Sequence, residues 1–417
     1  MKTICVMGLG YIGLPSASVL ATCGFKVLGV DVSSPVVDTI NRGNVHIEEP
    51  GLHTVVQAAI GSGNLRASLA AEPADVFIIA VPTPLTKDKR ADMSYVVRAA
   101  EAIMPFLREG NLVILESTSP PGTSRDLLAP MFIQAGWRIG VTLHLAHCPE
   151  RVLPGRILHE LVHNARVIGG YTPECAEAAR RIYAKFVDGD ILLTDVTTAE
   201  MVKVTENTFR DVNIALANET ALLCEKLSID FWEVARLTNH HPRVNLHNAG
   251  PGVGGHCISV DPWFLVERFP EDTGLISTAR RRNDGMPHHV ARRVMALLAG
   301  VEKPKVAALG LAFKGNVDDT RESPAYEVIS LLQEEGVFVA VHDPYVKTAE
   351  VELSSLEECF RGADCVVLLA DHSDYCHLNP PEVARLARNR VLLDCRNFLD
   401  RAQWSAAGFH VETVGRG

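Results

Sequence analysis

Short apolar runs alternate with longer helical patterns along the first part of the chain. Strands are predicted at residues 3–7, 26–30, 75–81, 111–116 and 141–147. Strands separated by helices indicate a parallel sheet that is covered by helices on both faces. The same alternation returns near the end of the chain, where strands are predicted at 305–311, 337–343, 365–370 and 391–394.

The stretch between these two regions has helical periodicity. Residues 197–227 contain neither proline nor glycine, and a helix of that length far exceeds the usual three to four turns. Such a helix commonly spans domains or forms a subunit interface. The pattern therefore predicts an α/β fold. Two Rossmann-like parallel-sheet domains, at 1–196 and 301–417, are joined by a long central helix within a helical middle region at 197–300.

Composition limits the classes of function. The chain has 417 residues, of which 47% are hydrophobic and 22% charged, and its formal net charge is −10. An acidic globular chain is a poor partner for nucleic acid or for an anionic membrane surface. No cleavable leader pattern opens the sequence, and no apolar run is long enough to span a bilayer. The ten cysteines form no Cys-x-x-Cys pair, so a cytoplasmic protein without a disulfide framework is expected.

A glycine pattern follows the first predicted strand. Gly8, Gly10 and Gly13 fit G-x-G-x-x-G between a strand and a helix. In this motif the first glycine permits a tight turn, the second lets a pyrophosphate approach, and the third permits close packing of helix on sheet. Asp31 ends the second predicted strand, and a carboxylate there suits a ribose diol but repels a 2′-phosphate. The pattern predicts a site for NAD rather than NADP.

A second glycine-rich segment, at 250–255, leads to Cys257. Glycine lets a backbone approach a ligand closely and adopt positive φ, so Cys257 is placed like a nucleophile, with the carboxylate of Asp261 four residues on. The alternative is a buried structural cysteine. An aldehyde beside a cysteine forms a thiohemiacetal, which becomes a thioester on losing a hydride. A redox cofactor together with such a cysteine predicts oxidation through a covalent thioester.

The long predicted helix carries a candidate pair. Lys203 and Asn207 are four residues apart and so share one face, with Arg210 near it. Side chains of these types can move a proton and hold a water or a hydroxyl. The alternative is an ordinary solvated helix face.

Several further clusters contain basic residues or histidines. His240–Arg243 and the segment from Phe313 to Arg321 are candidates for holding phosphate, whereas Arg280–Arg282 is expected to be solvated charge. His159 and His163 match H-E-x-x-H formally. Zinc proteases need that motif inside a long helix with a third ligand beyond it, so no metal site is expected.

Seven motifs, in order, resemble the UDP-glucose/GDP-mannose dehydrogenase family over nearly the whole chain. They are Gly8–Gly13, Ala80–Pro84, Glu116–Thr118 with Pro121–Thr123, Cys148–Arg151, Lys203 with Asn207, Gly254–Cys257 with Asp261, and Lys314–Gly315 with Arg321–Pro324. The resemblance implies an NAD-binding domain at 1–196, a central domain that forms a homodimer at 197–300, and a UDP-sugar-binding domain at 301–417. Ser259 departs from the family pattern, where alanine is expected.

The resemblance also implies roles for individual residues. NAD contacts are expected from Gly8, Gly10, Tyr11, Ile12, Gly13, Asp31, Thr83, Thr118 and Arg321. Catalytic roles are expected for Cys257 as nucleophile, for Lys203 as general acid/base, and for Asn207, Asp261, Glu150 and Thr118. Contacts with the UDP-sugar are expected from Arg151, Val152, Lys203, Asn207, Arg210, His241, Arg243, Val253, Phe313 and Lys314.

The activity that the resemblance implies is a four-electron oxidation of UDP-N-acetyl-D-mannosamine at C6, with two NAD per sugar. Segments 148–155 and 251–264 favour this acetamido sugar, because UDP-glucose enzymes typically read differently there. The product would feed an acidic surface polysaccharide such as enterobacterial common antigen or capsule.

Three alternatives stay open. The first is another nucleotide-sugar 6-dehydrogenase, acting on UDP-glucose or UDP-N-acetylglucosamine. The second is a β-hydroxyacid dehydrogenase, which makes one NADH per turnover. The third is a non-catalytic NAD-binding redox sensor that uses Cys257 as its switch.

Overall fold

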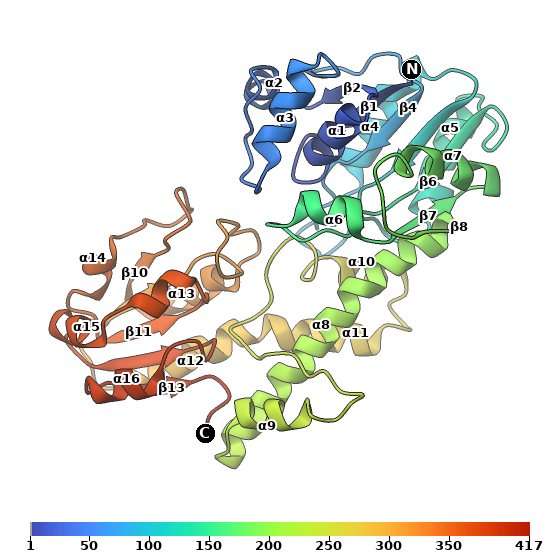
Figure 1. Ribbon diagram of the computed structural model, residues 1–417. Coiled ribbons are helices and arrows are strands. Elements are labelled where there is room, and N and C mark those ends of the chain that lie inside the picture. Colours follow the sequence, from blue (N-terminus) through green and yellow to red (C-terminus); the bar gives the residue numbers. More distant parts are fainter. Residues whose placement is uncertain (1) are drawn as a thin grey trace. The chain divides into compact units, whose positions relative to one another are not determined.

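The computed structural model describes residues 2–417 (Figure 1). The chain forms two compact units. Unit 1 contains the residues up to Glu206 together with Trp263–Phe269, and unit 2 contains Asn207–Pro262 and Pro270–Gly417.

Unit 1 is built on an eight-stranded sheet with the order β3-β2-β1-β4-β5-β6-β7-β8. The strands are β1 (Thr3–Met7), β2 (Lys26–Val30), β3 (Leu65–Ser68), β4 (Val76–Ile79), β5 (Asn111–Leu115), β6 (Leu143–His147), β7 (Arg166–Gly170) and β8 (Ile191–Asp195). Neighbouring strands are parallel, except that β6 and β7 are antiparallel. The parallel α/β fold that the sequence predicts is confirmed, with this one reversal added.

Helices cover both faces of this sheet. They are α1 (Gly13–Thr22), α2 (Ser34–Asn41), α3 (Leu52–Gly61), α4 (Ser94–Ile103), α5 (Ala129–Gln134), α6 (Ile157–His163) and α7 (Pro173–Tyr183), with a 3₁₀ turn at Met104–Phe106 and a π-helical turn at Ser124–Leu128. One core cluster joins the sheet to α1, α2, α3, α6 and α7, and the other joins it to α4 and α5. Because both faces are covered, β4 and β5 are buried at every position.

Unit 2 contains a five-stranded parallel sheet with the order β10-β9-β11-β12-β13. The strands are β9 (Lys305–Leu309), β10 (Phe338–His342), β11 (Cys365–Leu368), β12 (Val391–Asp394) and β13 (His410–Thr413). One face of the sheet is covered by α12 (Met286–Leu297) and α13 (Pro324–Glu334). The other face is covered by α14 (Leu356–Phe360), α15 (Pro380–Leu386) and α16 (Arg401–Ala406), together with a 3₁₀ turn at Ser373–His377. The remaining helices are α9 (Phe231–Thr238), α10 (Asp261–Arg268) and α11 (Gly274–Asp284).

Four observed strands, β3, β7, β8 and β13, were not expected from the sequence. β7 reads Arg166-Val-Ile-Gly-Gly, and its arginine and glycines conceal a strand whose five positions are all buried. β8 exposes Leu192 and Leu193 at the edge of the sheet. Edge strands and strands that bury polar groups lack the continuous apolar run on which the prediction rests.

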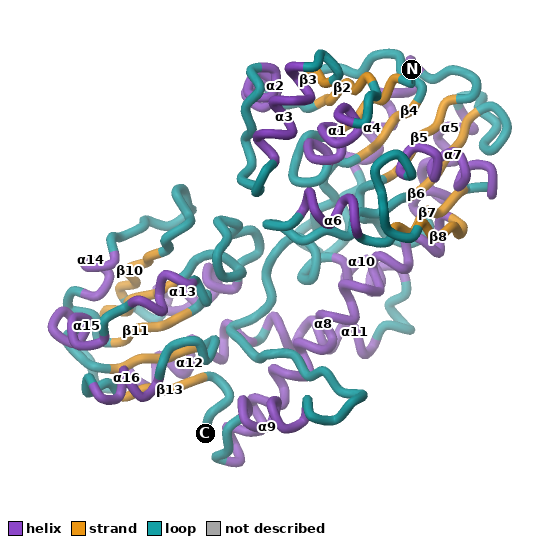
Figure 2. The backbone as a smooth tube through the Cα atoms, in the orientation of Figure 1, coloured by secondary structure: helices purple, strands orange, loops and turns teal. Residues whose placement is uncertain are grey.

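The predicted long helix is confirmed as α8 (Val196–Leu227), which has 32 residues (Figure 2). The division between the two units falls within it. It departs from a typical amphipathic helix, because several of its buried positions carry polar residues and several of its exposed positions carry apolar ones. Buried polar positions are Glu200, Lys203, Asn207, Thr208, Asp211 and Asn218, and exposed apolar positions are Met201, Phe209, Leu216, Leu223 and Leu227.

Candidate active site residues in the two units

The glycine loop after β1 has the geometry of a dinucleotide site. A Cβ atom at Gly8, where φ is 93°, would lie 2.7 Å from the Ala80 carbonyl oxygen, and one at Gly13 would lie 1.9 Å from the Gly8 oxygen. At Gly10, by contrast, a Cβ atom would meet nothing within 4 Å. Packing therefore accounts for Gly8 and Gly13, whereas Gly10 leaves open the space that a pyrophosphate requires. Tyr11 and Ile12 are half-buried before α1.

The carboxylate of Asp31 is fixed by the backbone. One oxygen accepts a hydrogen bond from Leu9 N at 3.0 Å, and the other accepts one from Ser33 N at 2.9 Å. Each carboxylate oxygen has a further lone pair, so a ribose diol can still donate to Asp31. The glycine loop and this acid together fit NAD.

Thr83 and Thr118 are adjacent, because Thr83 Oγ1 donates to the carbonyl oxygen of Thr118 at 2.7 Å. The loop that follows is held from α8. The buried carboxylate of Glu200 accepts hydrogen bonds from Gly122 N at 2.5 Å and from Ser124 N at 2.7 Å. Burial raises the pKa of Glu200 to about 6 against the lowering effect of these donors. The prediction from the sequence missed Glu200, although it lies one helical turn before Lys203.

Lys203 is buried, and its charge acts on His147 at the end of β6. Burial lowers the pKa of His147 to about 3, and the Lys203 ammonium contributes to the same shift. The imidazole is therefore neutral at ordinary pH. Neither of its ring nitrogens has a hydrogen-bond partner among the described residues. This buried polar side chain was also missed, because a histidine within a strand pattern reads as core.

The segment after β6 carries the predicted Glu150, Arg151 and Val152. Arg151 Nε donates to Glu206 at 3.1 Å, within a bidentate ion pair, and its Nη1 donates to the Ala165 oxygen at 2.9 Å. Glu150 is buried and accepts a hydrogen bond from Arg166.

A further acid that the sequence did not identify, Glu49, holds the continuation of this segment. Its two carboxylate oxygens accept hydrogen bonds from Gly155 N at 2.7 Å and from Ile157 N at 2.8 Å. Glu49 thereby anchors the start of α6.

In unit 2, Cys257 lies in a loop that runs into α10. Its side chain is exposed, whereas Asp261 is buried. The carbonyl oxygen of Cys257 accepts Val260 N at 3.1 Å and Asp261 N at 2.8 Å. Burial lowers the pKa of His256, and the Arg321 guanidinium is the next cause. A neutral imidazole therefore precedes the cysteine.

The glycines before Cys257 adopt the positive φ expected of them at Gly252 and Gly255, and they also allow close packing within the chain. A Cβ atom at Gly254 would lie 2.6 Å from both the Glu322 oxygen and the Phe313 Cβ, and one at Gly255 would lie 3.0 Å from the Phe313 ring. Gly255 also has φ of 83° and donates its N–H to the Arg321 oxygen at 2.9 Å. The glycines make room for the segment 313–324 of the same chain. They place the predicted residues Phe313 and Arg321 beside the loop that carries Cys257.

Asn207 and Asp261 are in direct contact. Asn207 Nδ2 donates to Asp261 Oδ2 at 2.5 Å, and both side chains are buried. Farther along α8, Asn218 Oδ1 accepts Gly250 N at 2.9 Å, so the same helix also holds the start of the glycine segment. Asn207 is one helical turn from Lys203, as the spacing predicts.

Other predicted residues lie at the surface. Arg210, His241, Arg243 and Lys314 are exposed, and Val253 is half-buried. Arg321 forms a bidentate ion pair with Asp319, at 2.9 and 2.6 Å. Within the two units the structure groups Phe313 and Arg321 with the Cys257 loop. It places His241 and Arg243 in a separate exposed loop after α9.

The loop that carries Lys314 is fixed by a buried acid. Asp343, at the end of β10, accepts Leu311 N at 2.7 Å and Ala312 N at 3.0 Å. His372 Nδ1 accepts Asn316 N at 2.9 Å, so its Nε2 carries the proton and donates to Asp343 at 2.9 Å. Chiefly through His372 and these backbone donors, the pKa of Asp343 is held well below its ordinary value despite burial.

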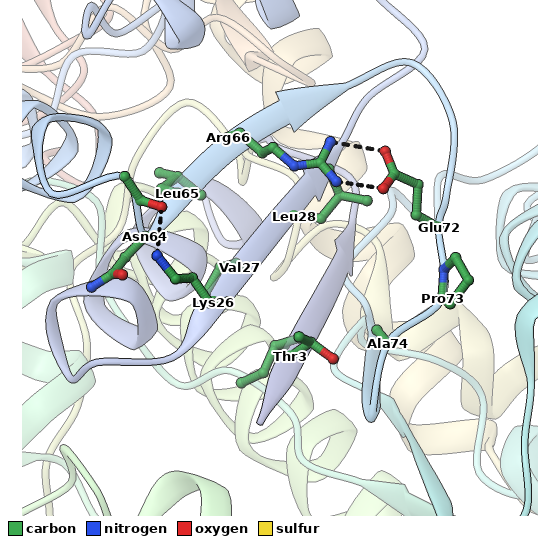
Figure 3. A pocket seen from close by; sticks show the side chains of 12 residues that line it. Thr3, Lys26, Val27, Leu28, Asn64, Leu65, Arg66, Glu72, Pro73 and Ala74 are labelled. Carbon is green, nitrogen blue, oxygen red and sulfur yellow. Dashed lines mark hydrogen bonds and ion pairs between the residues drawn. The ribbon is translucent and has the colours of Figure 1, made fainter. Parts of the chain in front are cut away.

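Two other features lie apart from these residues. A pocket at the amino ends of β1, β2 and β3 is lined by Lys26, whose Nζ donates to the Gly63 oxygen, and by Arg66, which pairs with Glu72 (Figure 3). Ligands of parallel sheets bind at the carboxyl ends of strands. His159 and His163 lie on α6 with ring centroids 4.5 Å apart. Over residues 2–417, no three histidine, cysteine or acidic side chains are grouped to hold a metal.

Within the same range, none of the helices combines the length and apolar character that crossing a bilayer requires.

Comparison with known families decides the class of protein. Family models match residues 2–187 as the NAD binding domain, 197–285 as the central domain and 307–401 as the UDP binding domain of the UDP-glucose/GDP-mannose dehydrogenase family. The chain belongs to this family. It is therefore an NAD-dependent nucleotide-sugar dehydrogenase whose substrate is a UDP-sugar.

Relatives match over their full length. The chain is 47% identical to the UDP-N-acetyl-D-mannosamine dehydrogenase of Methanococcus maripaludis, covering 100% of this chain and 98% of the relative. It is 48% identical to the NDP-N-acetyl-D-galactosaminuronic acid dehydrogenase of Ralstonia nicotianae, covering 97% of each. The solved structure of UDP-D-ManNAc dehydrogenase from Pyrococcus horikoshii has a TM-score of 0.94 at 42% identity, covering 100% of this chain and 99% of that one.

The carboxylate of Asp31 gives a first test of the dehydrogenase. Asp31→Ala is expected to raise the Kd for NAD about tenfold, since a hydrogen bond to a charged group contributes ~1.5–3 kcal/mol. It should also reduce the preference for NAD over NADP. Calorimetric titration with both cofactors measures this, with the exposed Asp38→Ala as the control. An unchanged affinity for NAD would exclude Asp31 from the cofactor site.

The contact between Asn207 and Asp261 gives a second test. Asn207→Ala should lower the free energy of unfolding by ~1–3 kcal/mol, because a buried carboxylate loses a donor. The matched control is Asn213→Ala on the same helix, whose amide donates only to the Phe209 oxygen. Denaturant unfolding of the three proteins compares them, and equal losses from both variants would contradict the contact.

Proposed function

We propose that this dehydrogenase oxidises UDP-N-acetyl-D-mannosamine at C6 to the uronate, through covalent intermediates on Cys257. The observation that carries the proposal is the exposed cysteine at the start of a turn that ends in the buried Asp261, hydrogen-bonded to Asn207. A simple alcohol dehydrogenase needs no such nucleophile. The names of the relatives from Methanococcus maripaludis and Pyrococcus horikoshii support the choice of sugar.

NAD, when bound, accepts one hydride in each of two successive oxidations. Gly8, Gly10 and Gly13, with Tyr11 and Ile12, surround its pyrophosphate, and Asp31 accepts from its ribose. Thr83 and Thr118 would hold the loop beside it, and Arg321 is the remaining residue assigned to NAD. This assignment follows the shape of the glycine loop and the orientation of the Asp31 carboxylate.

The first half of the reaction converts the C6 alcohol to an aldehyde. The hydroxyl proton leaves to a base or water near Lys203 and Asn207 as the hydride departs. The Cys257 thiol then adds across the aldehyde, so its sulfur bonds to C6 and the aldehyde is never released. Lys203 stabilises the negative charge that develops on the oxygen.

The second half converts the adduct to an acid. Loss of a second hydride and a proton gives a thioester, which water cleaves to the carboxylate and the free thiol. Asp261 or Glu150 activates this water. The balance is one sugar alcohol, one water and two NAD⁺ giving one carboxylate, two NADH and three protons.

The UDP-sugar is assigned to the remaining predicted residues. Phe313 and Lys314 follow β9, and Arg210, His241, Arg243 and Val253 belong to the same unit. Arg151 and Val152 follow Glu150 in unit 1. The alternative substrate is another nucleotide sugar, which the name of the Ralstonia nicotianae relative supports. A panel of UDP-N-acetylmannosamine, UDP-N-acetylglucosamine, UDP-N-acetylgalactosamine and UDP-glucose, followed by NADH formation, distinguishes these substrates.

We also propose a homodimer formed through residues 197–300. Along α8, Phe209, Leu216 and Leu223 are seven residues apart, and 63%, 55% and 54% of their surfaces are exposed. Apolar residues with this heptad spacing form the seam of packed helices, and an exposed apolar patch of this kind typically marks an interface. On this assignment 1–196 binds NAD and 301–417 binds UDP.

The location and pathway are part of the proposal. All ten cysteines are free thiols, which suits the reducing cytoplasm. A uronate is an acidic building block for surface polysaccharide, such as enterobacterial common antigen or capsule.

The cysteine mechanism predicts a stoichiometry. Cys257→Ala should abolish the second oxidation, so that two NADH per sugar are no longer made, whereas NAD binding should be unchanged. The exposed Cys23→Ala and Cys376→Ala should behave like the unsubstituted protein. NADH absorbance and product analysis by mass spectrometry provide the measurement. Two NADH per sugar from the Cys257 variant would refute the mechanism.

The dimer predicts an effect of charge on the α8 stripe. Leu216→Glu with Leu223→Glu should convert the dimer to monomer. In the dimer the new carboxylates would be buried without a cation to pair with. Light scattering on a sizing column measures the mass. Ile133→Glu on α5, outside residues 197–300 and comparably exposed at 52%, is the control and should leave the mass unchanged. A dimer that survives the double substitution would place the interface elsewhere.

A further inference from the structure

A cluster of buried charged side chains lies behind Glu150 in unit 1. Glu116 directly follows β5, Glu150 follows β6, and Arg166 begins β7. Their exposed fractions are 2%, 7% and 3%. Neither Glu116 nor Arg166 was among the residues expected to act.

Arg166 holds Glu150 directly. Arg166 Nη2 donates to Glu150 Oε2 at 2.7 Å, and the other carboxylate oxygen, Oε1, accepts Arg151 N at 2.7 Å. Both oxygens of Glu150 are therefore engaged, and the plane of its carboxylate is fixed. A hydrogen bond from a guanidinium is among the strongest that a buried carboxylate can accept.

The guanidinium is itself confined. It lies over the rings of Tyr183 and Phe186, with centroids at 4.7 and 5.6 Å. Its Nη1 donates to Cys148 Sγ at 3.7 Å and is 3.8 Å from Glu116 Oε1. Arginine suits this place because its planar group stacks on aromatic rings while its fork binds acceptors on two sides.

We propose that Arg166 is a positioning residue that, together with Glu116, holds the Glu150 carboxylate in one orientation for the reaction. The inference rests on the proposed function only in assigning Glu150 to the chemistry. Glu116 balances the charge of the cluster, since its carboxyl group shares the Arg166 guanidinium with Glu150.

The charge balance explains why Glu116 matters. The cluster has one guanidinium and two carboxyl groups, and a second unpaired buried anion is costly. Burial, followed by the nearby Glu150, raises the pKa of Glu116 to about 7, although Arg166, Tyr183 and Ser16 oppose this shift. Glu116 thus retains a proton in weakly acidic solution and leaves Arg166 to Glu150.

Other titratable groups around the cluster stay neutral over the same range. Burial raises the pKa of Cys148 to about 12 and the pKa of Tyr183 well above its ordinary value. Burial also lowers the pKa of His147, which directly precedes Cys148, to about 3. Among these groups, Glu116 is therefore the one that changes its protonation state near neutral pH.

The sign of the linked stability follows. Folding raises the pKa of Glu116 from 4.5 to about 7, so the folded chain binds this proton more tightly than the unfolded chain. The resulting stabilisation is complete below about pH 4.5 and is lost as pH rises through about 7.

Kinetics test the positioning. Arg166→Lys keeps the charge but loses the fork, so kcat should fall on the order of tenfold, as for other residues that orient an active group, while KM for the UDP-sugar changes little. Because Lys cannot reach both carboxyl groups, adding Glu116→Gln should restore part of the lost kcat. Arg180→Lys, on the surface of α7 and paired with Glu177, is the matched control and should leave kcat unchanged.

Unfolding tests the cluster without turnover. Relative to the unsubstituted protein, Glu116→Gln should gain about 3 °C in Tm between pH 5 and pH 8, because it removes the costly ionisation. An identical pH dependence of Tm for both proteins would overturn the charge balance. A wild-type kcat in Arg166→Lys would overturn the positioning. If the unsubstituted protein makes no NADH from any nucleotide sugar, the proposed function fails, while Tm still decides on the cluster.

Discussion

Buried polar groups must find partners, and the buried polar side chains of α8 meet this constraint by holding loops in each of the two units. A helix that buries Glu200, Lys203 and Asn207 is stable only if each one meets a donor, an acceptor or a charge. Glu200 meets the backbone of the loop after Thr118, and Asn207 meets Asp261. The contacts that stabilise the helix therefore also hold the loop after Thr118 and the turn that ends at Asp261. Several apolar side chains of the helix, among them Phe209, Leu216 and Leu223, lie on its exposed face.

The two α/β domains place an acid at equivalent positions but use it differently. Asp31 follows β2, the strand beside β1, and Asp343 follows β10, the strand beside β9. Asp31 accepts one backbone hydrogen bond from the glycine loop and keeps capacity for a ribose. Asp343 accepts two backbone hydrogen bonds from its loop and one from His372. The second acid is committed to the protein itself, since it fixes the loop that carries Lys314.

Much of the fold and part of the site could be predicted. Continuous apolar runs identify the strands buried on both faces, and the spacing of Gly8, Gly10 and Gly13 identifies a loop whose shape is set by local sterics. Arg166 and His147 could not be found, because each lies within a strand and gains its surroundings from elements distant in sequence. The strand β7 itself was missed for the same reason: its buried arginine is tolerable only beside Glu150 and Tyr183.

The sequence by itself determined the alternation of strands and helices, the length of α8, the glycine loop and the order of the family motifs. These depend on periodicity and on local backbone freedom, which are properties of neighbouring residues. Tertiary structure alone decided which face of α8 is buried and why Gly254 and Gly255 are needed. It also decided that Glu116 shares a cation with Glu150. Such features depend on desolvation and close contact between remote segments, and neither can be read from spacing along the chain.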